Sequence, residues 1–312
     1  MGTVDSRMFP TGYAHPDYAA SLAEFGVPRR LPRSGGWILE RGIFGSDLKD
    51  AIGAYPLFVC SDWGALAADL DELGSRLVSL CVVPDPFGAF TVEDLPPLFP
   101  ELARPYKEHA VVDFERPLAI SRHHRKCAAQ ALRHIDVDVL HPDENGGLPD
   151  GFLDDWIALH EHLVARHAII GISAFSRTAF ERQLRLPGLV VIRARQSDVT
   201  VGAQLWLVHA GVAYGHVLAL NPDGTRGGAG YALYSTAFDH FRDRVRYCDI
   251  GGVPDRSTEG ATGLQAFKRG WSPETRTTWL CGRVFDRPGY DALVSARSAG
   301  PSQFFPAYRD RL

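Results

Sequence analysis

The sequence lacks the usual marks of a disulfide-bonded, zinc-binding or membrane-spanning protein. Five cysteines, an odd number without CxxC spacing, argue against a disulfide framework and a zinc site. There is no HExxH motif, and we expect no metal. No apolar run reaches the length of about eighteen residues that suggests a membrane helix, and the N-terminus lacks a signal-peptide pattern. We therefore expect a cytoplasmic protein without membrane insertion.

The chain also lacks an excess of positive charge. Its 33 Lys and Arg residues face 37 Asp and Glu residues, and the net charge is −4. A field of this sign gives no general attraction to DNA, RNA or an anionic membrane, so we expect no DNA partner. The one dense basic run, residues 122–126, suits a tRNA backbone, a carrier-protein helix or coenzyme A phosphates, or else is a solvated helix face.

The hydrophobic pattern predicts an α/β (α+β) chain in three parts. Residues 1–36 are rich in Pro, Gly and Arg and suggest an extended lead-in. Residues 37–105 form a smaller lobe, in which a strand at 56–62, a helix at 64–77 and a strand at 78–85 have the spacing of a βαβ unit. A Pro-rich connector at 94–105 separates it from a larger domain, residues 106–312.

The larger domain has more regular periodicity. Trp156, Ile157, Leu163 and Val164 form the expected apolar stripe of the helix at 153–167. The remaining predicted elements are helices at 122–134, 177–185 and 263–271, a helix after residue 230, and strands at 108–114, 136–140, 189–196, 200–211, 212–220, 247–253 and 277–285.

A glycine-rich segment, NPDGTRGGAGY (221–231), joins a predicted strand to a predicted helix. Each ordered glycine costs roughly 0.5–1 kcal/mol relative to alanine, so the run indicates that another group approaches the backbone. Unpaired amides at a helix N-terminus bind anions, which makes a phosphate the first hypothesis. A tight turn into the helix is the alternative.

Several segments, in this order, resemble a bacterial branch of the GNAT acyltransferases related to the Fem-type aminoacyl transferases. They include YKEHAVVDF, SRHHRKCAAQALRHIDVDV, VGAQLWLVHAGVAYGHVLALN, CDIGGV, GLQAFKRGW and FFPAYR, between residues 106 and 309. The resemblance implies a mixed central sheet with two splayed strands, flanked by helices and preceded by a degenerate GNAT-like lobe.

The resemblance also implies a reaction. We expect an N-acyltransferase that moves an acyl group from a thioester, on coenzyme A or on the phosphopantetheine arm of an acyl carrier protein, to a small-molecule amine, in natural-product or envelope biosynthesis. No tightly bound cofactor is expected. The alternatives are a Fem-like transferase that uses aminoacyl-tRNA, and a GNAT-like binding module without catalysis.

The GNAT donor loop, (Gln/Arg)-x-x-Gly-x-(Gly/Ala), falls on Arg226, Gly227, Gly228, Ala229, Gly230 and Tyr231. The register is imperfect, because Ala229 stands where glycine is expected and Tyr231 where a small residue is expected. Lys268 and Arg269, in the family-like FKRGW stretch, are further candidates for donor phosphates, or a surface cation pair over Trp271.

The catalytic candidates lie on the two strands that the resemblance expects to splay. In Tyr214-Gly215-His216, a histidine with a pKa near neutrality would take the amine proton, with Tyr214 beside it. A hydrogen-bonded core histidine is the alternative. Asp249 would orient the amine or His216, or form a cap or salt bridge, and Asp255 would meet a cationic acceptor.

Overall fold

The computed structural model describes residues 10–74, 76–252, 261–297, 302 and 304–310, which form two compact units. Unit 1 contains residues 107–276 and the described residues before Pro16, and unit 2 contains residues 16–106 and the described residues from 277 onward. The predicted domain 106–312 differs at its C-terminal end. Strand β11 (Thr275–Val284) pairs with β4 (Ser79–Val82), so most of β11 and everything after it belong to unit 2.

The sheet of unit 1 is mixed, as the sequence predicts. Its strands lie in the order β5, β10, β9, β8, β7, β6. They are β5 (Leu102–Asp113, of which 107–113 lie in this unit), β6 (Asp136–Leu140), β7 (Leu189–Gln196), β8 (Val199–His209), β9 (Val212–Leu220) and β10 (Tyr247–Gly252). All neighbours are antiparallel except β9 and β10, which are parallel.

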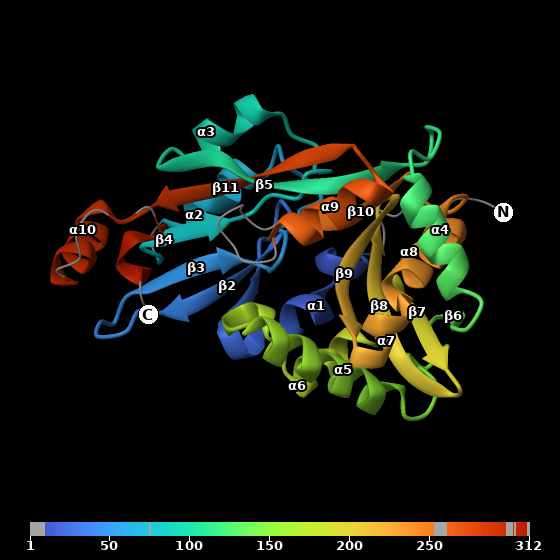
Figure 1. Cartoon of the computed structure of the whole chain (residues 1–312). Helices are drawn as coiled ribbons and strands as arrows, with labels where there is room; N and C mark the ends of the chain where they lie inside the picture. The colour runs from blue at the N-terminus through green and yellow to red at the C-terminus, as the bar shows by residue number, and fades with distance from the viewer. Residues whose placement is uncertain (1–9, 75, 253–260, 298–301, 303, 311–312) are drawn as a thin grey trace. The chain divides into compact units, whose positions relative to one another are not determined.

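Helices cover both faces of this sheet (Figure 1). They are α4 (Arg122–Ala131), α5 (Phe152–His167), α6 (Arg177–Gln183), α7 (Pro222–Gly227), α8 (Ala229–Phe241), α9 (Ala261–Trp271) and the 3₁₀ turns η1 (Gly12–Ala14) and η4 (Gly171–Ser173). Alternation along the strands sends Val190 and Ile192 into the core beneath α8, and the opposite face of β8 and β9 packs against α5.

Two local predictions in unit 1 need correction. The buried stripe of α5 is Phe152, Trp156, Leu159 and His160, whereas Leu163 and Val164 are only half-buried. The glycine-rich segment is largely helical rather than a loop. Asn221 accepts a hydrogen bond from the Gly224 amide as the N-cap of α7, and Pro222 is the first helical residue.

The strands of unit 2 lie in the order β1, β2, β3, β4, β11. The elements not yet given are β1 (Val27–Arg30), β2 (Trp37–Gly42), β3 (Lys49–Gly53), α1 (Pro16–Ser21), α2 (Leu66–Leu73), α3 (Leu95–Leu98), α10 (Arg287–Ala296), η2 (Ala23–Phe25), η3 (Val92–Asp94) and η5 (Ala307–Arg309). The βαβ unit is real, because β3 and β4 are parallel and α2 connects them.

The first strand of that unit was misplaced. Residues 56–62 hold only one isolated bridge, from Phe58 to Pro84, and the strand is β3. The extended lead-in is also wrong, since residues 16–21 form α1 and residues 27–30 pair with β2. These elements are too short to show a hydrophobic periodicity in the sequence, and contacts with other parts of the chain stabilise them.

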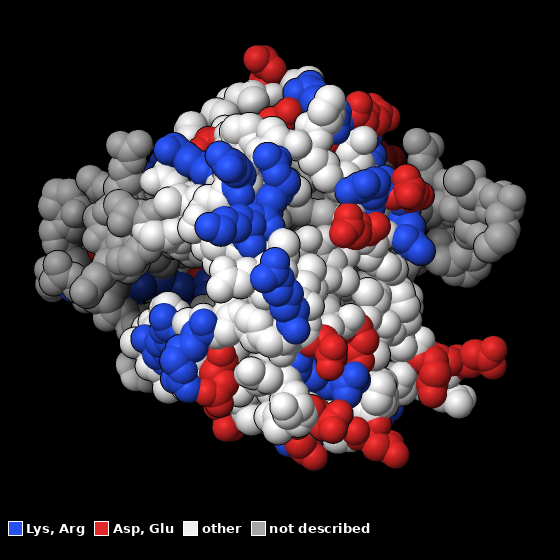
Figure 2. Space-filling view, turned by 45° about the vertical axis from the view of Figure 1, so that its right-hand side comes forward, with Lys and Arg blue, Asp and Glu red and all other residues white. Residues whose placement is uncertain are grey.

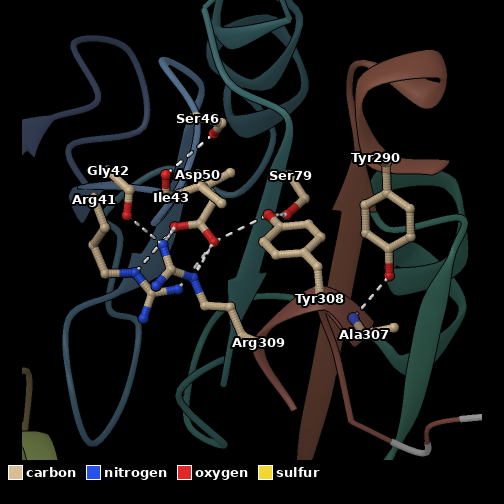
Figure 3. A network of polar contacts seen from close by, with 10 residues as sticks. All are labelled: Arg41, Gly42, Ile43, Ser46, Asp50, Ser79, Tyr290, Ala307, Tyr308 and Arg309. Atoms are coloured by element: carbon tan, nitrogen blue, oxygen red, sulfur yellow. Dashed lines mark hydrogen bonds and ion pairs between the residues drawn. The ribbon is translucent and has the colours of Figure 1, made fainter. Parts of the chain in front are cut away.

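A polar network fixes the C-terminal segment within unit 2 (Figure 3). The Asp50 carboxylate is fully buried and accepts hydrogen bonds from Arg41 at 3.1 Å, Tyr308 at 3.0 Å and Arg309 at 2.5 Å. Ser79 Oγ lies 2.8 Å from the Tyr308 hydroxyl. The buried charge is thus fully compensated, and η5 is held against β3.

Candidate functional site

Strands β9 and β10 separate at one point of unit 1. Within their described residues they pair over three positions, the last of which is Tyr214 with Asp249, although β9 continues to Leu220 and β10 to Gly252. On its other edge β9 has a bulge, because Leu205 pairs with Val217 and Trp206 with Gly215, which leaves His216 as the extra residue. We call this point the splay.

His216 is half-buried in a cluster on the α5 and α6 side. The Tyr13 hydroxyl lies 3.1 Å from Nδ1 and Gln183 Oε1 lies 3.1 Å from Nε2, so a neutral ring accepts from Tyr13 and donates to Gln183. Burial, with a smaller contribution from His160, lowers the pKa of His216 to about 3. This value lies well below the near-neutral pKa that the sequence analysis expects, and it favours the neutral ring.

Tyr214, the other candidate on β9, is buried beside this cluster. Its ring centroid lies 5.4 Å from that of Tyr13 in an edge-to-face arrangement. Its backbone is directly opposite Asp249 in the ladder. Tyr214 is thus the last residue of β9 that pairs with β10.

A second histidine, His109 on β5, contacts Asp249. The Asp249 side chain is only 2% exposed, and its two oxygens lie 2.8 and 3.1 Å from His109 Nδ1. One of these oxygens also accepts the Gly251 amide at 2.7 Å. With Nδ1 donating to the carboxylate, Nε2 of His109 is left as the basic nitrogen.

Lys268 on α9 lies next to this pair. Its Nζ donates to the Gly252 carbonyl at 2.7 Å, and the side chain is buried. Burial lowers the pKa of Lys268 to about 8; Lys107 lowers it further, whereas Asp249 opposes the shift. Gly251, with φ of +85°, is the residue that fits here, because a Cβ would lie 3.2 Å from Nζ.

The glycines between β9 and α8 have a packing explanation. A Cβ on Gly224 would lie 2.1 Å from the Val201 carbonyl, and Gly228 has a left-handed φ of +76° between the two helices. Arg226 pairs with Asp223, and the first residues of α8, Ala229 and Gly230, are buried. These contacts favour the turn interpretation over an open pyrophosphate cradle.

An apolar surface lies between this junction and the splay. Leu218 and Leu220 on β9, Tyr231 on α8 and Phe267 on α9 are half-buried and pack against the core beneath α8. The Tyr231 and Phe267 ring centroids are 5.1 Å apart. An extended arm or acyl chain would find apolar contacts along this path.

The structure brings together only some of the predicted site residues. Asp249 and Lys268 lie in one cluster, His216 and Tyr214 in another, and Gly227 and Gly228 at the junction of α7 and α8. Arg269 is exposed, and Asp255 lies outside the described residues. Among the described residues, no group of three or more His, Cys, Asp or Glu side chains could hold a metal ion.

Sequence reasoning missed His109, although it predicts a strand at 108–114 that contains this residue. The histidine stands where β5 changes from exposed to buried residues. A histidine at the start of a buried run could have been singled out as a candidate. Its partner Asp249, however, is 140 residues further along the chain.

Residues 115–269 match the family of GNAT acetyltransferase domains. The chain carries a GNAT domain. The match spans α4 to α9 and so includes both splayed strands and Lys268, whereas His109 precedes it. No curated protein sequence matches the chain significantly.

Solved structures are similar to almost the whole chain. FemX has a TM-score of 0.65 at 14% identity, covering 94% of this chain and 98% of its own. The C-terminal domain of a putative lysylphosphatidylglycerol synthetase from Agrobacterium fabrum has a TM-score of 0.62 at 17% identity, covering 92% and 95%. The L-PGS structure from Bacillus licheniformis has a TM-score of 0.56 at 14% identity, covering 92% and 98%.

The GNAT match confirms the predicted fold class and the prediction of an acyltransferase. At these identities the solved structures show a shared fold. No helix among the described residues is both long and apolar enough to cross a membrane.

Proposed function

We propose that the GNAT domain transfers an acyl group from a phosphopantetheine thioester to an amine acceptor at the splay. The observation that carries this proposal is the arrangement of His109, Asp249 and Lys268 where β9 and β10 stop pairing. Amide formation requires a base and a group that stabilises negative charge. His109, oriented by the Asp249 carboxylate, is the base, and the buried Lys268 is the cation. The third requirement, positioning, is supplied by the unpaired backbone beyond Tyr214.

In the proposed reaction, His109 Nε2 takes a proton from the attacking amine, while Asp249 holds Nδ1–H and so fixes the ring. The amine nitrogen bonds to the thioester carbonyl carbon, and the negative charge that develops on the carbonyl oxygen is stabilised by the Lys268 ammonium. Collapse breaks the carbon–sulfur bond. The departing thiolate takes the proton from His109 Nε2, which leaves an amide and a free thiol and restores the neutral ring.

The apolar surface formed by Leu218, Leu220, Tyr231 and Phe267 supports the thioester donor, because a pantetheine arm and an acyl chain are long and largely uncharged. The buried start of α8 supports a donor that makes few phosphate contacts there. The role predicted for Arg226 and for residues 227–231 becomes, in this proposal, turn formation and contact with the arm. Arg269, exposed beside Lys268, stays a candidate for the donor phosphate.

A second candidate is transfer from aminoacyl-tRNA. It is supported by the resemblance to Fem-type transferases and by the basic residues of α4. A tRNA donor predicts binding that weakens steeply with salt, since each phosphate contact releases a counterion.

The test is release of free thiol from acyl-coenzyme A or acyl carrier protein, measured with a thiol reagent in the presence and absence of a panel of primary amines. We expect release that depends on the amine, together with a raised melting temperature in the presence of the donor. Consumption of aminoacyl-tRNA without thiol release from either thioester would contradict the proposal. Binding of a partner without turnover of any donor would favour a non-catalytic module.

A further inference from the structure

A row of cations runs along α4 and just past its end. Arg122, Arg125 and Lys126 lie at positions i, i+3 and i+4, which fall on one side of a helix, and Arg133 follows two residues after α4 ends. All four are exposed. We call them the α4 stripe. Figure 2 shows Lys and Arg side chains gathered on the face that contains α4.

The α4 stripe has no carboxylate partner among the residues that the structure describes. Residues 117–135 contain no Asp or Glu, and no ion pair between described residues includes a stripe side chain. Some other arginines of unit 1 are ion-paired. Arg193 pairs with Asp138 at 2.6 Å, and Arg242 pairs with Asp239 at 2.9 Å. The stripe is therefore a local, uncompensated positive charge on a protein of net charge −4.

Helix stability does not explain this charge. Arg122 and Arg125 lie in the first turn of α4, which has no acidic residue. Cations there oppose the helix dipole, at a cost of roughly 0.3–1 kcal/mol each. α5 has the opposite, favourable arrangement, with Asp154 and Asp155 in its first turn and basic residues in its last.

The helix that carries the stripe lies beside the donor side of the site. From α4, His124 Nε2 lies 2.8 Å from the Phe267 carbonyl, one residue before Lys268. Its ring centroid is also 5.1 Å from that of Tyr231. Just beyond the helix, His134 Nε2 lies 3.2 Å from the Gly227 carbonyl. A macromolecule bound to the α4 stripe would thus lie next to the apolar surface that leads to the splay.

We propose that the α4 stripe docks an acidic acyl carrier protein, whose phosphopantetheine arm delivers the thioester to the splay. The inference rests on the thioester donor proposed above. A single row of four cations fits one acidic helix, whereas an RNA backbone would need positive charge over a wider area than one row covers.

The experiment compares steady-state kinetics with acyl carrier protein and with the matching acyl-coenzyme A, for wild type, Arg122→Glu/Lys126→Glu and a control, Arg166→Glu/Arg185→Glu. The control reverses the charge of two exposed arginines, Arg166 in α5 and Arg185 just after α6. Neither belongs to the candidate site or to the α4 stripe. We expect the stripe variant to raise the KM for carrier protein about tenfold or more, with kcat unchanged and acyl-coenzyme A kinetics within about twofold. The control should match wild type.

Urea midpoints separate docking from folding. A glutamate in place of Arg122 puts a negative charge in the first turn, where it favours the helix dipole, so the variant should be no less stable than wild type. An unchanged KM for carrier protein, an equal rise in the KM for acyl-coenzyme A, or a loss confined to aminoacyl-tRNA would overturn docking. Transfer from acyl-coenzyme A alone also overturns it and leaves the proposed function standing, whereas transfer from neither thioester overturns both.

Discussion

Two histidine clusters of unit 1 flank the same strand separation and have opposite electrostatics. His216 is held between two neutral groups, Tyr13 and Gln183, and the pKa of its ring falls to about 3. His109 is held by the Asp249 carboxylate, beside the Lys268 ammonium. The comparison teaches that the position of a histidine on the expected strand does not make it the general base. Burial and hydrogen-bond partners decide whether the ring can accept a proton.

Removing the positive charge of Lys268 should lower kcat more than any other single change in the two clusters. If the Lys268 ammonium stabilises the developing oxyanion, Lys268→Met lowers kcat by about 10²–10³-fold. In wild type, kcat should fall as the pH rises through about 8, because the ammonium is lost above the lowered pKa of Lys268. Pre-steady-state and steady-state rates against pH measure both effects.

Arg269→Met is the matched control, because Arg269 is the exposed neighbour of Lys268. At saturating donor it should keep wild-type kcat and the same decline at alkaline pH, because a contact with the donor phosphate changes KM rather than kcat. Retention of that decline in Lys268→Met would assign it to another group.

Removing the charge of Asp249 should have a smaller effect. Asp249→Asn keeps the shape and the Gly251 amide contact but no longer favours the Nδ1–H form of His109, so we expect kcat to fall by about 10²-fold with KM little changed. Steady-state kinetics check this. A rise in KM alone would assign Asp249 to acceptor binding instead.

The smallest catalytic effect is expected in the neutral cluster. His216→Ala removes the hydrogen bonds of the ring to the Tyr13 hydroxyl and to Gln183 Oε1, which should lower the free energy of unfolding by about 1–3 kcal/mol. The kcat of the folded fraction should stay within a few-fold of wild type. Urea denaturation and turnover at a permissive temperature separate the two quantities.

Much of the fold of unit 1 could be read from the sequence. β7 and β9 begin and end where their alternating apolar runs do. The short strands β2 and β3 could not be read in this way, since buried acidic residues such as Glu40 and Asp50 interrupt the apolar pattern. Their charges are compensated by distant arginines, Arg309 for Asp50 among them.

The candidate site was less predictable than the fold. Asp249 and Lys268 were found because the glycines and the FKRGW stretch surround them. The role of His216 depended on desolvation by residues of α6 and η1, which no local pattern encodes. His109 required knowing that β5 pairs with β10 in a register that brings it next to Gly252.

The most direct test of the account is the ratio of kcat for His216→Gln to kcat for His109→Gln, with one thioester and one amine at a fixed pH. If His109 is the base and His216 a neutral structural group, the ratio is about 10² or more, in line with the usual contribution of a general base. A ratio near or below one would contradict the account and assign the proton transfer to the His216 cluster.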